Sequence, residues 1–110
     1  MAALVLGDGR RIVLEVAETR SARRRGLLGR TSVDGGALLI MKCRSVHTLG
    51  MRFAIDVAHL DSSMQILRLH MMSPRRLGAV VLRARHVLEA DAGAFGRWNL
   101  DVGDQLRVEP

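Results

Sequence analysis

The hydrophobic and polar residues of this chain fall into short runs separated by turn-forming residues. Residues 3–6 are apolar, Gly7-Asp8-Gly9 is a strong turn signal, and apolar and polar side chains alternate from Arg10 to Val16. Alternation with a period of two is typical of a half-buried strand. The first 16 residues are therefore predicted to form a β-hairpin.

A short helix is predicted over residues 21–28. Thr19 carries a side-chain oxygen that can cap its first turn. Gly29 is the expected C-cap, because glycine adopts the left-handed conformation without steric cost. Gly26 would then lie inside the helix, where it costs roughly 1 kcal/mol relative to alanine. That cost suggests that close packing requires its bare backbone.

The rest of the chain continues in short, mostly extended runs. Residues 37–41 are continuously apolar and predict a buried strand, and residues 53–60 and 64–69 predict a second hairpin across Asp61-Ser62-Ser63. Further strands are expected over residues 83–90 and 105–108, with a short helix over residues 92–100 that carries Phe95 and Trp98. Many short strands with glycine-marked turns predict a mainly β fold, a small barrel-like β-sandwich with one or two short helices.

Length and composition favour one globular domain over residues 1–110, large enough to bury a core without disulfides or metal. The single cysteine, Cys43, excludes an intramolecular disulfide and a zinc site with two cysteines from this chain. The first residues lack the basic region and the long apolar core of a signal peptide, and no apolar run approaches the roughly 20 residues of a membrane span. We therefore expect a cytoplasmic location.

Seventeen Lys and Arg residues against eleven Asp and Glu residues give a formal net charge of +6. All the cations except Lys42 are arginines, and they cluster at residues 23–25, 75–76, and 83 and 85. Such clusters either bind phosphates or an acidic partner, or they are solvated surface residues that reflect only the arginine-rich composition of the chain. No aromatic residues interleave with them, so a base-stacking platform for nucleic acid is missing.

The segment from Cys43 to Asp56 concentrates the polar chemistry of the chain. It contains the only cysteine, a histidine, two arginines, hydroxyls and an aspartate, and it runs into a predicted buried strand. Polar groups this dense are costly to bury without partners. The segment is therefore either a hydrogen-bonded structural clasp or a binding site.

Two acidic residues interrupt apolar runs, and each has two interpretations. Asp56 is either a general base or ligand anchor, or an acceptor for backbone amides or for an arginine such as Arg25 or Arg52. Glu89 lies in the same kind of context, and the two acids could form a carboxylate pair of the kind that many hydrolases use.

Cys43 and His47 could form a nucleophile–base pair, or they could be a loop cysteine and a hydrogen-bonded histidine with no joint role. A metal site is not expected. The candidate ligands are Cys43 and the four histidines, but no two of the histidines have the i,i+4 spacing of ligands on one helix face. Methionines in a strand-rich domain usually fill the core.

Four motifs, in order and spacing, carry a resemblance to a known family. They are Arg25-Gly-Leu-Leu-Gly-Arg30, the run from Ser45 to Asp61, Val87-Leu-Glu89 with Gly93, and Val102-Gly-Asp104. Together they resemble the family called domain of unknown function 192, over about residues 13–108. The resemblance implies a small β-rich, barrel-like fold and no established activity. It also implies that Arg25, Gly26, Gly29, Gly103 and Asp104 belong to the structural motif.

The chain departs from that family at one place. Many members carry a Trp-Met-Lys-Asn-Thr run where this chain reads His47-Thr-Leu-Gly-Met51, while the spacing to Asp56 is kept. The chain therefore resembles a subgroup marked by Cys-Arg-Ser-Val-His-Thr.

These observations lead to one functional hypothesis and two alternatives. The chain is predicted to be a ligand- or partner-binding accessory module that requires no cofactor and recognises a small anionic ligand or a protein partner. Its cleft would be lined by Cys43, Arg44, His47, Thr48, Arg52, Asp56 and Glu89. The alternatives are a small hydrolase-like enzyme with an acid pair or a Cys/His pair, and a binder of nucleic acid or an acidic partner through the arginine clusters.

Overall fold

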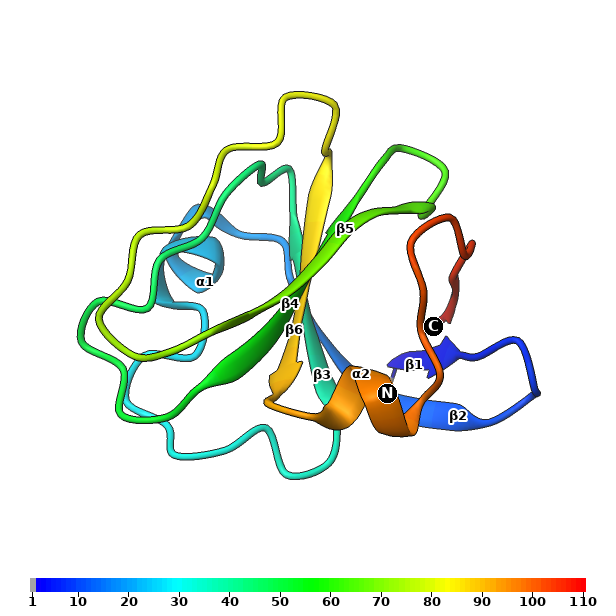
Figure 1. Cartoon of the computed structure of the whole chain (residues 1–110), viewed down its shortest axis with the longest axis horizontal. Helices are drawn as coiled ribbons and strands as arrows, with labels where there is room; N and C mark the ends of the chain where they lie inside the picture. The colour runs from blue at the N-terminus through cyan, green and yellow to red at the C-terminus, as the bar shows by residue number, and fades with distance from the viewer. Residues whose placement is uncertain (1) are drawn as a thin grey trace.

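The computed structural model describes residues 2–110, in which seven strands form one sheet accompanied by two short helices (Figure 1). The strands are β1 (Ala2–Val5), β2 (Arg11–Ala17), β3 (Ala37–Met41), β4 (Ile55–Leu60), β5 (Ile66–Met72), β6 (His86–Asp91) and β7 (Arg107–Glu109). The helices are α1 (Arg20–Arg25) and α2 (Ala94–Arg97). The strand order across the sheet is β5-β4-β6-β3-β2-β1-β7. The prediction of a mainly β, barrel-like fold with one or two short helices is confirmed.

Both predicted hairpins are present. β1 and β2 pair antiparallel, and so do β4 and β5. The Asp61 carboxylate closes the second turn by accepting the backbone N–H groups of Ser63 and Gln65, each at 2.9 Å. Met64 has a φ of 67°, in the left-handed region, so β5 begins at Ile66 and not at Met64 as predicted.

The central strands β3, β4 and β6 are covered on both faces, which explains why β3 is continuously apolar and why the apolar residues of β4 and β6 do not alternate with exposed polar ones. Because side chains alternate along a strand, the sheet separates two hydrophobic clusters. The first cluster packs against α2 and includes Leu39, Ala58, Leu60, Leu88, Ala90, Phe95 and Trp98. The second cluster packs against α1 and the segment after it, and it includes Leu27, Leu38, Ile40, Ile55, Val57 and Val87.

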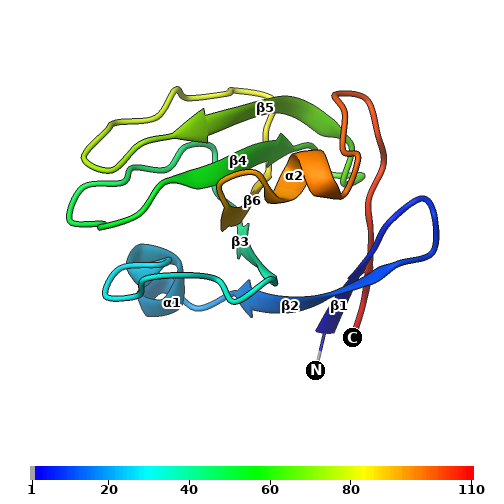
Figure 2. The same cartoon turned by 60° about the horizontal axis from the view of Figure 1, so that its bottom comes forward.

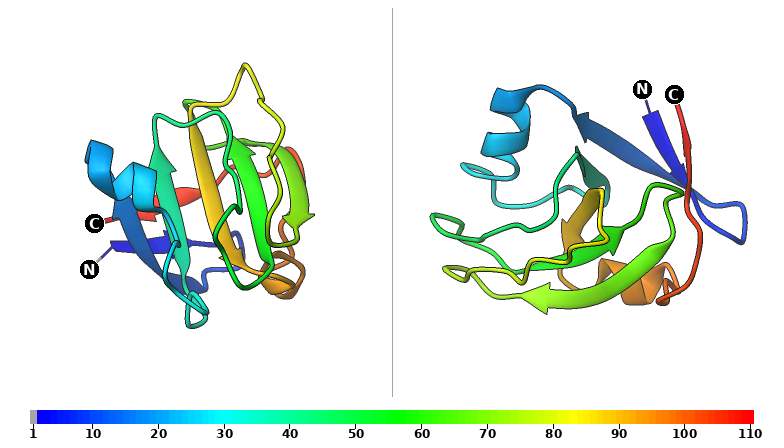
Figure 3. Two further views of the ribbon diagram at one scale, coloured as in Figure 1. Left: turned by 90° about the vertical axis from the view of Figure 1, so that its left-hand side faces the viewer. Right: turned by 90° about the horizontal axis from the view of Figure 1, so that it is seen from above.

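The sheet curls so that its two edge regions meet at one end (Figures 2 and 3). Gln65, just before β5, forms an isolated β-bridge with Gln105, just before β7. The Ile66 N–H donates to the Asp104 carbonyl at 2.8 Å, and the Gly103 N–H donates to the Ile66 carbonyl at 2.8 Å. The two layers expected of a sandwich are therefore the two ends of one half-barrel sheet.

The helix α1 lies in the crossover between β2 and β3, which are parallel neighbours. Thr19 caps it as predicted, with its hydroxyl accepting the Ala22 N–H at 3.1 Å. The predicted extent over residues 21–28 is wrong, because Gly26 has a φ of 50° and ends the helix. A Cβ added at Gly26 would meet no atom closer than 3.8 Å, so the backbone conformation, and not close packing, favours glycine.

The remaining predicted elements are present but displaced at their ends. The strand predicted over residues 83–90 is β6, at His86–Asp91, because the chain turns where the Ala84 N–H donates to the Val81 carbonyl. The helix predicted over residues 92–100 is confined to Ala94–Arg97, and the last strand is Arg107–Glu109. Among residues 2–110, no helix is long and apolar enough to span a membrane.

Candidate functional site

The polar segment predicted as a clasp or a site forms most of the loop between β3 and β4, residues 42–54. It lies beside the loop between β5 and β6, residues 73–85, at the end of the molecule away from the termini (Figure 3). Backbone hydrogen bonds join the two loops, from the Thr48 N–H to the Arg76 carbonyl at 2.8 Å and from the Gly78 N–H to the Val46 carbonyl at 2.9 Å. The two loops therefore form one irregular ribbon.

Thr48 fastens this ribbon and is fully buried. Its hydroxyl donates to the Ser73 carbonyl at 2.6 Å and accepts the Arg76 N–H at 2.8 Å. Both hydrogen-bonding functions of the hydroxyl are thus used within the fold. This part of the segment is a structural clasp.

Asp56 in β4 has a structural partner of its own. One carboxylate oxygen accepts the N–H groups of Gly93 and Phe95, each at 3.0 Å. These are N–H groups at the start of α2, whose N-cap residue, Gly93, makes no side-chain cap. Asp56 therefore caps α2 from a neighbouring strand, and the interpretation as an acceptor for backbone amides is confirmed.

Asp56 and Glu89 cannot act as a carboxylate pair, because they lie on opposite faces of the sheet. In the β4–β6 ladder Asp56 is opposite Ala90, and Glu89 is opposite Val57. Ala90 belongs to the cluster on the α2 face, and Val57 belongs to the cluster on the α1 face. The alternative of an acid pair, which the sequence left open, is therefore excluded, because the positions of the two acids in the paired strands differ by one residue.

Glu89 is the buried carboxyl group that the fold leaves without a partner. It is 3% exposed, and it makes no hydrogen bond or ion pair with the residues that the structure describes. Burial alone raises its pKa to about 7, from the ordinary 4.5, because desolvation disfavours the carboxylate. A buried polar group without a partner is the exception in folded proteins and needs an explanation.

The explanation lies in a cavity of about 200 Å³ between α1, β6 and loop 42–54, into which Glu89 opens. Three arginines of α1 and its end, Arg23, Arg24 and Arg25, contribute to its wall. Its other lining residues are Gly26, Leu27, Leu28, Ile40, Cys43, Ser45, Val46, His47 and Met51. The cavity thus brings together Cys43, His47 and Glu89 from the predicted cleft, and Arg25 from the structural motif.

Cys43 and His47 line the same cavity, but neither has the environment of a nucleophile–base pair. The Cys43 thiol donates to the Ser45 carbonyl at 2.9 Å. Burial raises the pKa of this thiol, and the Glu89 carboxyl adds to the shift while Arg23 opposes it. His47 uses Nδ1 to accept the Leu49 N–H at 3.2 Å. The cysteine is therefore held as a neutral thiol whose proton is directed at the backbone.

The other two predicted arginines lie elsewhere. Arg44 borders a second, open recess of about 690 Å³, and Arg52 is exposed. The recess is basic, and its remaining lining residues are Lys42, Cys43, Ser62, Ala84, Arg85 and His86. The Lys42 backbone has a φ of 54°, and its N–H donates to Nδ1 of His86 at 3.2 Å.

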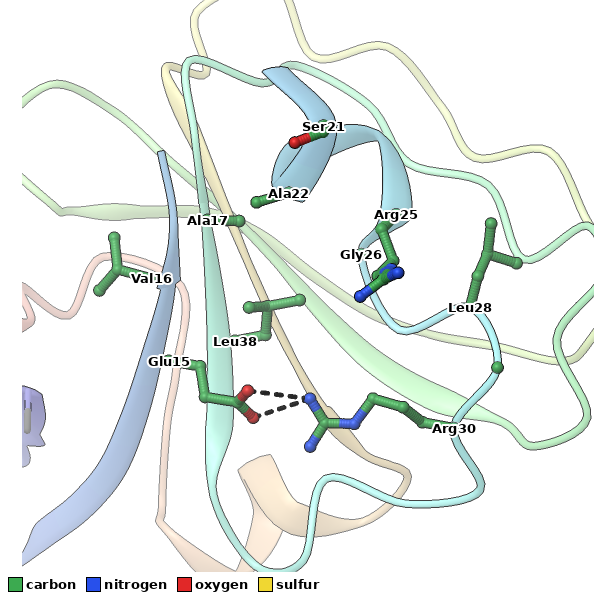
Figure 4. Close-up of a pocket in the computed structure, with 11 residues that line it drawn as sticks. Glu15, Val16, Ala17, Ser21, Ala22, Arg25, Gly26, Leu28, Arg30 and Leu38 are labelled. Atoms are coloured by element: carbon green, nitrogen blue, oxygen red, sulfur yellow. Dashed lines mark hydrogen bonds and ion pairs between the residues drawn. The ribbon is translucent and has the colours of Figure 1, made fainter. Parts of the chain in front are cut away.

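A larger groove of about 720 Å³ runs between β2 and α1 (Figure 4). A salt bridge closes one side of it, with the Arg30 guanidinium 2.9 Å from the Glu15 carboxylate. Figure 4 shows the Arg25 side chain reaching from the end of α1 into this groove. Arg25 therefore borders both the groove and the Glu89 cavity. The sequence does not indicate that Glu15 and Arg30 form a pair, because only the folding of the connection between β2 and β3 brings them together.

A pair of histidines lies deep on the α1 face, under loop 73–85. The rings of His59 and His70 stack, with centroids 5.4 Å apart and an interplanar angle of 13°. His59 is 1% exposed, and neither of its ring nitrogens has a hydrogen-bond partner among residues 2–110, although the carbonyls of Arg44 and Ala79 lie toward the ring. Burial, with His70 and Arg68 nearby, lowers the pKa of His59 to about 4. The pair is therefore neutral at physiological pH.

The glycine and aspartate of the last family motif are structural. Gly103 has a φ of 97°, which favours glycine, and the Asp104 carboxylate accepts the Asp101 N–H at 2.9 Å. Among the residues described, no group of three or more His, Cys, Asp or Glu side chains is arranged to hold a metal ion.

Two crystal structures share this fold. A protein of unknown function from Novosphingobium aromaticivorans superposes with a TM-score of 0.80 at 15% identity, covering 96% of this chain and 82% of that one. A candidate transcription regulator from Sinorhizobium meliloti superposes with a TM-score of 0.77 at 22% identity, covering 97% of this chain and 91% of that one. At these identities the likeness establishes the fold alone.

Comparison with known sequences identifies the family of this chain. A UPF0127 protein of Thermococcus sibiricus is 28% identical over 101 residues, a match that covers 87% of this chain and 66% of that protein. A UPF0127 protein of Pyrococcus furiosus is 36% identical over 62 residues, covering 56% of this chain and 53% of that protein. The chain thus spans about two thirds and about half of the lengths of these two relatives. The family model of DUF192, described as uncharacterised ACR, matches residues 3–108, and the chain belongs to that family.

Proposed function

We propose that this protein is a small-molecule binding module whose site is the Glu89 cavity. The observation that carries the proposal is the buried Glu89 carboxyl group, which faces a cavity and has no partner among residues 2–110. Burial without a partner costs free energy in the empty protein. A ligand with a complementary hydrogen-bonding group would remove that cost, so the unpartnered carboxyl group favours ligand binding.

The lining of the cavity suggests the chemistry of the ligand. Arg23, Arg24 and Arg25 form no ion pair within the described chain, and a guanidinium suits a carboxylate or phosphate group. We therefore assign the ligand one anionic group, bound by these arginines, and one hydrogen-bonding group, bound by Glu89. At about 200 Å³, the cavity holds roughly the volume of six or seven liquid water molecules. The ligand is smaller than a typical drug molecule.

The roles of the other predicted residues follow from their positions. Cys43 and His47 are proposed to contact the ligand, whereas Thr48 and Asp56 support the loop and α2. We also propose that the run Cys-Arg-Ser-Val-His-Thr marks a subgroup of the family that shares this cavity, because Cys43, Ser45 and His47 all line it. A cytoplasmic location remains our expectation.

The proposal is tested with a panel of small carboxylates, phosphates and amino acids, by ligand-observed NMR and thermal unfolding. A ligand at 100 times its Kd stabilises the protein by about 2.7 kcal/mol. We expect at least one panel member to bind, and Glu89→Leu, which removes the hydrogen-bonding group, and Arg25→Gln to weaken it at least tenfold. The controls Glu18→Leu and Arg20→Gln make the same kinds of change just outside the cavity and are expected to bind normally.

The pH dependence provides a second readout. Deprotonation of Glu89 above pH 7 places a negative charge near the bound anion, so affinity should fall as the pH rises through about 7. This dependence should disappear in Glu89→Gln. The proposal is rejected if no panel member binds at millimolar concentration, or if binding is insensitive to both cavity substitutions.

Acid–base catalysis is a second candidate, favoured by one observation. A pKa of about 7 is the value at which a carboxyl group transfers protons effectively near neutral pH. In that case Glu89 would act alone, since Asp56 is on the opposite face. A panel ligand that is converted to product, with turnover abolished in Glu89→Gln, would favour this candidate over simple binding.

A further inference from the structure

The net charge of the chain comes entirely from one segment. Residues 35–88 contain eight Lys or Arg residues and two Asp residues, which gives +6. The remaining residues contain nine Lys or Arg and nine Asp or Glu, which gives zero. The charged segment carries loops 42–54 and 73–85, which lie together at one end of the molecule (Figure 3).

The cations of this segment are also unpaired. The salt bridges among the described residues lie outside it, and they join Asp8 to Arg10, Glu15 to Arg30, and Glu109 to Arg11 and Arg107. No cation of residues 35–88 forms an ion pair within the described part of the chain. The end of the molecule that carries the two loops is therefore available to an anionic partner.

Loop 73–85 adds exposed aliphatic side chains to this charge. Leu77 is 78% exposed, Val80 is 62% exposed and Leu82 is 79% exposed. Four arginines, at positions 75, 76, 83 and 85, flank them, and residues 62–88 contain no acidic residue. Hydrogen bonds to loop 42–54 hold the backbone at Gly78 and Val81, so the fold itself presents these side chains to solvent.

We infer that loop 73–85 docks the protein peripherally on an anionic lipid surface. Arginines near such a surface are attracted to its headgroups, and each arginine increases the affinity for the surface about fivefold. Leu77, Val80 and Leu82 would enter the boundary between headgroups and acyl chains, as the apolar faces of interfacial segments do. Lys42, Arg44 and Arg85, which border the adjoining basic recess, extend the charged surface. This inference is independent of the Glu89 cavity.

Sedimentation with vesicles tests the inference on the full chain. The wild-type protein is expected to bind vesicles of phosphatidylcholine with phosphatidylglycerol, and not vesicles of phosphatidylcholine alone. The variant R76Q/R83Q should bind about 25-fold more weakly, from two losses of about fivefold each. The variant L77S/L82S should bind at least tenfold more weakly, because it loses the inserted apolar surface.

Matched controls separate docking from general electrostatics and from misfolding. R20Q/R97Q changes the net charge equally outside the charged segment, and Val102→Ser alters an aliphatic side chain that is 61% exposed there; both should bind vesicles as the wild type does. The inference is overturned if the wild type binds no vesicle, or if both arginine pairs reduce binding equally. It is also overturned if L77S/L82S binds vesicles as tightly as the wild type. A further overturning result is that nucleic acid or an acidic protein displaces the protein fully from vesicles at the same salt concentration. Either of these last two results would indicate a polyanion partner instead.

Discussion

Two buried carboxyl groups on opposite faces of one sheet have contrasting surroundings. Asp56, on the α2 face, accepts two backbone N–H groups at 3.0 Å. Glu89, on the α1 face, accepts none from the residues described, and burial raises its pKa to about 7. They occupy neighbouring strands, opposite Ala90 and Val57, and both interrupt apolar runs.

The contrast indicates that burial alone does not mark a functional residue. An acid that accepts hydrogen bonds from backbone N–H groups inside the fold contributes to stability, as Asp56 does for α2. An acid that faces a cavity without partners costs stability, and such groups are candidates for function. The two carboxyl groups should therefore respond to substitution with opposite signs.

The largest effect is expected from Asp56→Ala. This substitution leaves the N–H groups of Gly93 and Phe95 without their acceptor, in a part-buried and a buried site respectively. We expect the free energy of unfolding to fall by about 3 kcal/mol, since bonds to a charged acceptor contribute about 1.5–3 kcal/mol each. Urea denaturation monitored by circular dichroism measures this loss.

Asp56→Asn is the matched control, because it keeps one oxygen acceptor at the same place. It should retain more than half of the lost stability. If alanine at position 56 cost less than about 1 kcal/mol, the structural role that we assign to this carboxylate would be wrong.

Glu89→Gln should have the opposite sign, with a stabilisation of about 2 kcal/mol at pH 7.5. The pKa of Glu89 is about 7 in the folded state and 4.5 ordinarily, so the unfolded state releases its proton first as the pH rises. The stability of the wild type should therefore fall between pH 4.5 and about 7 and then level off. In Glu89→Gln this fall should be absent.

Urea titrations at pH 4.5 and 7.5 measure the difference between the two proteins. The exposed control Glu18→Gln should follow the wild type at both pH values. A Glu89→Gln protein that is less stable than the wild type at pH 7.5 would show that the carboxylate is satisfied after all, and the contrast with Asp56 would be lost.

His59→Leu should give a smaller stabilisation at neutral pH, about 1 kcal/mol, because it removes two buried nitrogens that have no partner. Its main effect should be on pH dependence. The pKa of His59 is about 4 in the folded state and 6.5 ordinarily, so the unfolded state binds a proton first as the pH falls. The wild type should therefore lose stability between pH 6.5 and about 4, and His59→Leu should not.

This measurement is best made in the Glu89→Gln background. The pH windows of Glu89 and His59 overlap between 4.5 and 6.5 with opposite slopes, so they partly cancel in the wild type. If H59L/E89Q loses as much stability on acidification as Glu89→Gln alone, then His59 is not the group that takes up the proton.

The fold could be predicted from the sequence largely because its signals are local. The alternation in β2, the apolar run of β3 and the Thr19 cap each depend on neighbouring residues, and all are present. The errors occur at element ends, and at two of these ends a residue in the left-handed region is responsible. Gly26 ends α1 early, and Met64, which has a side chain but a φ of 67°, delays β5. A methionine gives no sequence signal for that conformation.

The candidate site could be predicted only in part, because it is assembled by strand pairing. Cys43, His47 and Glu89 do share a cavity, but whether Asp56 joins them depends on which face of the sheet it occupies. A difference of one position in the β4–β6 register decides that, and it cannot be deduced from either strand alone. Likewise, the sequence of Arg23 and Arg24 fits a solvated helix face, and only the fold shows that they line a cavity with Glu89.

The smallest effect is expected from Thr19→Ala, which tests the other helix cap. Thr19 provides one hydrogen bond to α1, from an exposed position, whereas Asp56 provides two to α2 from a buried one. We expect a loss of about 1 kcal/mol or less in the free energy of unfolding, with Thr19→Ser close to the wild type. Because α1 carries the arginines of the Glu89 cavity, the same variant should also weaken ligand binding slightly. A loss as large as that of Asp56→Ala would mean that the two caps are equivalent, so burial of the cap would not account for the difference between the two faces.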